Sequence, residues 1–228
     1  MQTSIKENLL PLYNTGRKRA QWVTLLLAFV FVPPCYAETD VLPGDYGALW
    51  VGFNPDTRII TGYYENYTGW DEETGQAQFS CIFYLHGKIE GDPPYRITTW
   101  YPSTQPEEII AGQLNVSETN DYYLLSIHLD EEHGGCWNVE HFADAAAAEF
   151  TLEEESPWRE IRVIAAEQAF LHDAPEAEKK TTHALVKDTA IGVLDARPGW
   201  VYTETWQDEQ MIKGWIRSED LYPDTADH

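Results

Sequence analysis

Apolar and polar residues alternate in short runs along the first two thirds of the chain. This period of two is typical of β-strands with one buried face. Glycine, proline, asparagine and aspartate separate the runs, for example at Asn54-Pro55-Asp56 and Pro93-Pro94. The spacing predicts an antiparallel β sandwich or barrel over residues 38–142. We expect its strands at 48–53, 58–67, 79–87, 95–101, 109–116, 122–129 and 136–139.

Glycines interrupt three of these runs, at Gly52, Gly62 and Gly112. A glycine inside a strand often marks a bulge or sharp bend, so we expect such irregularities there. One segment has helical composition instead. Phe142–Phe150 includes four successive alanines, which are the best helix formers, and Glu153–Pro157 would end the helix. We therefore interpret residues 143–158 as a linker between two domains.

A second set of β-type runs begins near Glu160, at residues 161–164, 169–175, 182–187 and 190–194. It continues through two Gly-Trp pairs, Gly199-Trp200 and Gly214-Trp215, and closes at Leu221. On these pairs and their order, residues 159–228 resemble the bacterial SH3-like domain family. One departure is Lys187-Asp188, where many members have Lys-Gly-Asp. The resemblance implies a small β barrel that binds peptides, wall components or other proteins. The architecture of the first domain is loosely similar to small eight-stranded calycin-like barrels.

The N-terminus has the three parts of a secretory signal peptide. A basic cluster, Gly16–Arg19, precedes the apolar run Trp22–Val32, and Cys35-Tyr36-Ala37 offers small residues at a cleavage site. We predict cleavage after Ala37 and a periplasmic or secreted protein, without stable membrane insertion. The alternative is an uncleaved anchor, but the run is shorter than the roughly 20 apolar residues that span a bilayer.

Cleavage would leave two cysteines, Cys81 and Cys136. In an oxidising compartment they have one intramolecular pairing, so we predict a Cys81–Cys136 disulfide. Closing a loop of this size is worth roughly 4 kcal/mol in the chain-entropy model.

Acidic residues dominate the charge. The chain has 38 acidic and 15 basic residues, and removal of residues 1–37 would leave 37 and 11, a formal net charge of −26. Such a chain repels nucleic acid, anionic lipid and anionic wall polymers, and it attracts basic proteins. The alternative is that the acidity serves only solubility. Aromatic residues make up 13% of the chain, which excludes an acidic disordered protein.

Catalytic signatures are missing from the sequence. It lacks Gly-x-Ser-x-Gly and His-Glu-x-x-His, and no cofactor motif is present. Histidines and acidic residues gather near Cys136, but their spacing matches no standard zinc pattern, so we predict neither metal nor cofactor. The group comprises His128, Glu131, Glu132, His133 and His141. We predict no enzyme activity, and a hydrolase with an unrecognised carboxylate site remains the alternative.

Aromatic residues beside turns are the better functional candidates. Tyr67, Trp70 and Trp206 lie next to polar residues and are expected to be exposed, whereas Trp200 and Trp215 are expected to pack. We predict that the binding residues are Tyr67, Trp70, Tyr202 and Trp206.

The hypothesis is an exported binding protein for a basic protein partner, in its sharpest form an inhibitor of a wall-degrading enzyme. A peptidoglycan-targeting module is the alternative, for which Lys179, Lys180 and Lys187 are the candidate basic face.

Overall fold

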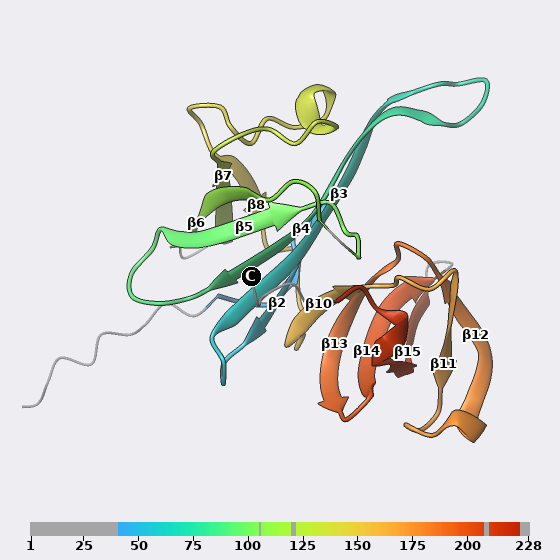
Figure 1. Ribbon diagram of the computed structural model, residues 1–228. Helices are drawn as coiled ribbons and strands as arrows, with labels where there is room; N and C mark the ends of the chain where they lie inside the picture. Colours follow the sequence, from blue (N-terminus) through green and yellow to red (C-terminus); the bar gives the residue numbers. More distant parts are fainter. Residues whose placement is uncertain (1–40, 105, 120–121, 208–209, 224–228) are drawn as a thin grey trace, which may run out of the picture. The chain divides into compact units, whose positions relative to one another are not determined.

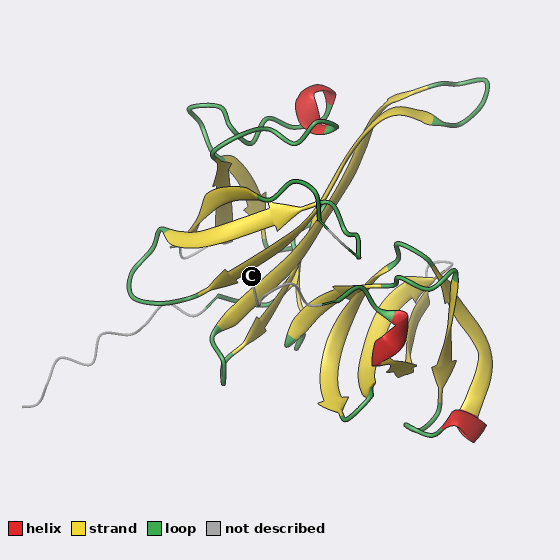
Figure 2. Cartoon of the chain, viewed as in Figure 1, coloured by secondary structure: helices red, strands yellow, loops and turns green. Residues whose placement is uncertain are grey.

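The computed structural model describes residues 41–104, 106–119, 122–207 and 210–223, all within one compact unit, 37–228. They form two antiparallel sheets and three single-turn 3-10 helices, which confirms the predicted all-β fold class (Figures 1 and 2). The predicted signal peptide lies outside the described residues. In the described part of the chain, no helix has the length and hydrophobicity needed to cross a membrane.

The first sheet is an up-and-down meander in which successive strands are neighbours. Its strands are β1 (Gly44–Asp45), β2 (Leu49–Asn54), β3 (Ile59–Trp70), β4 (Ala77–Lys88), β5 (Tyr95–Trp100), β6 (Ile110–Glu118), β7 (Tyr123–Leu129), β8 (Ala148–Thr151) and β9 (Glu154–Glu155). The register passes through Gly52, Gly62 and Gly112 without a shift, so none of these glycines marks a bulge.

The two ends of this sheet meet on one segment. Strand β8 pairs with β7 and strand β9 pairs with β1, and the two are separated only by Leu152 and Glu153. Both intervening amides continue the ladders, because Leu152 donates to the Tyr123 carbonyl (2.9 Å) and Glu153 to that of Asp45 (2.8 Å). The sheet is therefore closed through residues 148–155.

This closure corrects the helix predicted over Phe142–Phe150. Residues 148–151 are a strand whose alternate residues Ala148 and Phe150 are buried. Pairing with β7 and burial of Phe150 outweigh the helix propensity of the alanines, which is only a few tenths of a kcal/mol per residue. Residues 143–158, interpreted as a linker, thus contribute two strands to the first sheet.

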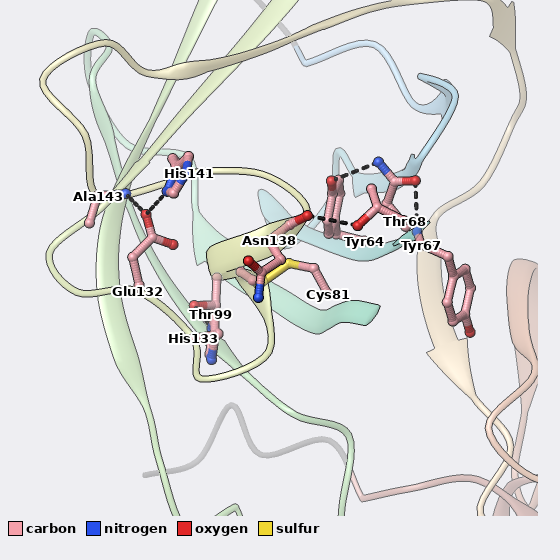
Figure 3. Close-up of a disulfide and its surroundings, with 12 residues drawn as sticks. Tyr64, Tyr67, Thr68, Cys81, Thr99, Glu132, His133, Asn138, His141 and Ala143 are labelled. Carbon is pink, nitrogen blue, oxygen red and sulfur yellow. Dashed lines mark hydrogen bonds and ion pairs between the residues drawn. A yellow bond between two sulfur atoms is a disulfide. The ribbon is translucent and has the colours of Figure 1, made fainter. Parts of the chain in front are cut away.

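Aromatic rings and the disulfide fill the interior of the first sheet. Tyr64 stacks on Phe83 (5.0 Å between ring centroids), and Phe142 meets both rings edge-on. The predicted Cys81–Cys136 disulfide is present and fully buried (Figure 3). It holds a 3-10 turn, η1 (Cys136–Asn138), against β4, where a strand was predicted at 136–139. The Val139 amide bonds back to the Cys136 carbonyl, so this backbone is tied into a turn.

The second sheet has the order β10-β13-β14-β15-β11-β12. Its own small core includes Leu171, Ile191 and Ile216. The strands are β10 (Glu160–Val163), β11 (Gln168–His172), β12 (Lys180–Val186), β13 (Ala190–Arg197), β14 (Trp200–Gln207) and β15 (Gln210–Arg217), with the single turns η2 (Ala177–Lys179) and η3 (Ser218–Asp220).

Strand β10 joins the two sheets. Its Ile161 amide donates to Thr61 Oγ1 (2.7 Å), and its carbonyl accepts from Tyr84 Oη (2.8 Å). Gly52 makes this approach possible, because a Cβ there would lie 2.6 Å from the carbonyl carbon of Glu160. Side chains of the first sheet therefore satisfy the hydrogen-bonding groups of Ile161 on the edge of β10 that faces away from β13. At Gly52 the backbones of the two sheets are in direct contact.

Trp158 is the largest side chain at this junction. It is 1% exposed, stacks on Trp50 (4.9 Å between ring centroids) and donates from Nε1 to Glu204 Oε1 (2.7 Å). The carboxylate of Glu204 also pairs with Lys213. The indole lies directly against Gly192, where a Cβ would be 2.2 Å from Nε1. Gly192 therefore provides the space that Trp158 occupies.

We predict that Gly192→Ala destabilises the protein by about 2 kcal/mol or more, because the added methyl displaces the indole and strains its hydrogen bond. Gly134→Ala is the matched control, since a Cβ there meets nothing within 4 Å and its φ is not positive. Urea unfolding followed by tryptophan fluorescence measures both changes. Equal midpoints for Gly192→Ala and the control would contradict this account of the junction.

Candidate functional site

The hairpin of β3 and β4 extends beyond its neighbouring strands (Figure 1). The ladder of β2 with β3 ends at Tyr64, and that of β5 with β4 ends at Tyr84. We call residues 66–80 the arm. Its β3 and β4 segments pair only with each other and have no other strand beside them. One side-chain contact supports it from outside, because Thr68 Oγ1 donates to the Asn138 carbonyl (2.7 Å; Figure 3).

The arm carries exposed aromatic side chains. Trp70 is 63% exposed, Phe79 40% and Tyr67 38%, and the rings of Tyr67 and Trp70 lie 6.3 Å apart. The exposure expected for Tyr67 and Trp70 is confirmed. Phe79 was missed, because it begins an otherwise buried strand pattern and only the missing neighbour strand exposes it.

The turn at the end of the arm is acidic. Asp71, Glu72 and Glu73 follow one another, and residues 66–80 contain no lysine or arginine. The Asp71 carboxylate accepts hydrogen bonds from the amides of Thr74 (2.8 Å) and Glu73 (2.9 Å). These bonds, with that of the Thr74 hydroxyl, lower the pKa of Asp71. The Asp71 carboxylate therefore keeps its negative charge to a lower pH than an ordinary aspartate.

A cleft of about 550 Å³ lies between the outer face of β2–β3 and the β12–β13 and β14 segments of the second sheet. Tyr63, Glu65 and Tyr67 share one face of β3 because side chains alternate along a strand, and Trp50 is the cross-strand partner of Tyr63. The whole lining is Gly47, Ala48, Trp50, Tyr63, Glu65, Tyr67, Lys187, Asp188, Thr189, Ala190, Thr205 and Trp206.

Phenol hydroxyls fix the carboxylates of the cleft. Tyr67 donates to Glu65 Oε1, and Tyr222 donates to Asp188 Oδ1 (2.8 Å). Burial, reinforced by Glu65, raises the pKa of both Tyr63 and Tyr67 well above the ordinary value, so both phenols remain protonated donors. The cleft therefore combines neutral aromatic walls with two carboxylates.

The β12–β13 turn places Asp188 in a left-handed conformation, with φ of 67°. Aspartate tolerates this conformation better than most residues. The Nζ of its neighbour Lys187 lies 3.6 Å from Glu167 Oε1 and forms an exposed ion pair with this residue, which is outside the cleft.

Three of the four predicted binding residues come together. Tyr67 and Trp206 line the cleft, with Trp206 45% exposed, and Trp70 lies beside Tyr67. Tyr202 does not line it, because its ring packs on Trp215 (5.2 Å). Trp215 is buried and Trp200 half-buried, as expected. Trp50, Tyr63, Glu65 and Asp188 were missed as a group; the alternation of Tyr63, Glu65 and Tyr67 was the available signal.

The histidines near Cys136 do not converge. Cys136 is in the disulfide, and His133 is buried against Phe83, with Nε2 2.8 Å from Thr99 Oγ1. Glu132 instead accepts the Ala143 amide (2.7 Å), and its Oε1 lies 4.0 Å from His141 Nδ1 (Figure 3). Among the described residues, no group of three or more histidine, cysteine or acidic side chains is arranged to hold a metal ion.

Burial lowers the pKa of His133 below 6.5, although Glu108 and Glu132 act in the opposite direction. The unfolded chain therefore binds more protons than the folded protein as His133 begins to titrate, and stability should fall as the pH drops through 6.5 toward the lower pKa of the folded state. We predict a shallower fall for His133→Asn than for the wild type, measured by urea unfolding at each pH. The exposed His183 provides the control, and His183→Asn should keep the wild-type slope. An unchanged slope in His133→Asn would show that other groups set the dependence.

Comparisons with known proteins give this site no counterpart: no family model matches the chain, and no curated protein or solved structure matches it significantly.

Proposed function

We propose that this is an exported, non-catalytic binding protein that contacts a basic protein through its arm. One observation carries the proposal. Three exposed aromatic side chains and three successive carboxylates share the arm, residues 66–80, which has no lysine or arginine. Exposed aromatic residues of this kind supply most of the energy at protein interfaces, and a surrounding negative charge steers a basic partner toward them.

The form of the arm narrows the kind of partner. A two-stranded extension with an acidic turn at its end suits a concave, positively charged site better than a flat one, because both edges of the arm lack a neighbouring strand and the narrow hairpin can enter a cavity. The sharpest version of the proposal is inhibition of a basic wall-degrading enzyme, whose substrate cleft the arm would occupy. The net charge of −23 extends the attraction beyond the contact itself.

We propose the SH3-like assignment for the second sheet, on the two Gly-Trp pairs of β14 and β15 described above. In this proposal the second sheet helps to form the binding surface, since Trp206 lines the cleft together with Tyr67. Peptidoglycan targeting is the competing role. Two of the lysines that could form a basic face for peptidoglycan already have other contacts. Lys187 pairs with Glu167, and Lys180 lies over the ring of Phe170.

We predict that Trp70→Ala weakens binding to a basic wall-degrading enzyme by about 2 kcal/mol, roughly 30-fold, because a largely exposed ring is lost from the arm. The measurement is titration calorimetry with such enzymes, beside acidic proteins of similar size. Tyr122→Ala is the matched control, since Tyr122 is 50% exposed but lies outside the arm and the cleft. Thermal unfolding should be nearly unchanged in both variants.

Association should also slow steeply with salt, as the Debye length shortens from about 30 Å at 0.01 M to about 8 Å at 0.15 M. Two results would overturn the proposal. One is salt-independent binding to purified peptidoglycan with no basic protein bound, which would favour wall targeting. The other is turnover of a wall or sugar substrate by the purified protein, which would make it an enzyme.

A further inference from the structure

The cleft beside the arm has a composition of its own. It combines four aromatic side chains with two carboxylates, and the basic residue in its lining, Lys187, is paired with Glu167 outside it. We propose that this cleft binds one basic side chain, preferentially an arginine, of the partner protein. This inference rests on the proposed function, because the arginine would belong to the basic protein that the arm contacts.

Aromatic walls favour a cation over a neutral side chain. A guanidinium or ammonium group is attracted to the face of a tryptophan or tyrosine ring within about 6 Å of its centroid. The protein already uses this interaction, since Arg197 lies over Trp215 (4.8 Å) and Arg217 over Trp200 (5.7 Å). In the cleft, Tyr67 (38% exposed) and Trp206 (45% exposed) have rings open to such a contact, and the buried Tyr63 and half-buried Trp50 complete the aromatic lining.

The carboxylates determine the charge and the shape of the side chain that the cleft can bind. Glu65 and Asp188 each accept one phenol hydrogen bond, and a carboxylate has about four lone-pair sites, so both retain capacity for a further donor. Arginine matches this set better than lysine, because its planar group stacks on rings and donates two parallel hydrogen bonds to a carboxylate. An anionic wall polymer would be repelled by the same groups.

The walls are held in place before any guest arrives. Tyr63 is 4% exposed, and its hydroxyl donates to the Asp188 carbonyl (3.4 Å), which links β3 to the β12–β13 turn. Trp50 is fixed by its stacking on the buried Trp158. A preformed cleft avoids the ordering penalty that weakens binding to mobile side chains. Its volume, about 550 Å³, is large enough for a complete arginine side chain with its hydration.

The first test uses a free probe. N-acetyl-arginine amide should shift the indole N–H signals of Trp50 and Trp206 in ¹⁵N-labelled full-length protein, as a saturable function of concentration. N-acetyl-lysine amide should shift them less, and the neutral isostere N-acetyl-citrulline amide should not. Trp137 is the internal reference, because it is 61% exposed and does not line the cleft. Equal shifts with arginine and citrulline would overturn the inference.

The second test uses the basic protein partner and variants. Glu65→Gln and Trp206→Ala should each weaken its binding at least tenfold, whereas Trp137→Ala should have the wild-type affinity. Near-ultraviolet circular dichroism checks that each variant is folded. If Glu65→Gln does not fold, Trp206→Ala alone provides the test.

The two proposals fail differently. Wild-type affinity in both cleft variants, with Trp70→Ala still weakened, would overturn the cleft inference alone. Saturable arginine binding without association to any basic protein would overturn the proposed function.

Discussion

The hydrogen bond from the Trp158 indole to the Glu204 carboxylate is the interaction on which the arrangement of the two sheets depends. The Glu204 side chain is 5% exposed, and its charge is compensated by this donor and by Lys213. Hydrogen bonding to Glu204 in turn raises the pKa of Lys213. Removing one partner of a buried charge is far more damaging than removing both, so tryptophan, glutamate and lysine act as a set. Two glycines leave the space that this arrangement needs. Gly192 leaves room for the Trp158 indole, and Gly52 leaves room for the backbone of Glu160.

The junction and the candidate site are parts of one aromatic face. On the outer side of the first sheet, Tyr63 is 4% exposed where the second sheet covers it. Two residues further Glu65 is half-buried, Tyr67 is 38% exposed, and Trp70 is 63% exposed. Burial therefore decreases steadily along β3, as the strand leaves the junction and enters the arm. The period-two pattern of Tyr63, Glu65 and Tyr67 that packs the sheets together continues into the arm as far as Tyr67, and Trp70 follows out of phase after Gly69.

This continuity explains what the sequence could predict. Alternation predicted most strands and the all-β class, and cysteine counting predicted the disulfide. The helix at Phe142–Phe150 was wrong because the propensity of four alanines is a local quantity, whereas the pairing of β8 and β9 closes a sheet that begins a hundred residues earlier. Tyr202 and Trp206 lie on one face of β14 and look alike in the sequence. The cross-strand contact of Tyr202 with Trp215 on the neighbouring β15 shows that Tyr202 packs within the second sheet.

The acidity of the chain opposes the stability of the fold. Ion pairs such as Lys88–Glu90 and Arg217–Glu219 are exposed and contribute little to folding, while 38 acidic residues against 15 basic ones repel one another in the folded state. The buried aromatic interior and the disulfide must offset this repulsion. Added salt would therefore screen a term that opposes folding and, at the same time, a term that favours a basic partner. Opposite salt dependences of stability and of the proposed binding follow from one charge distribution.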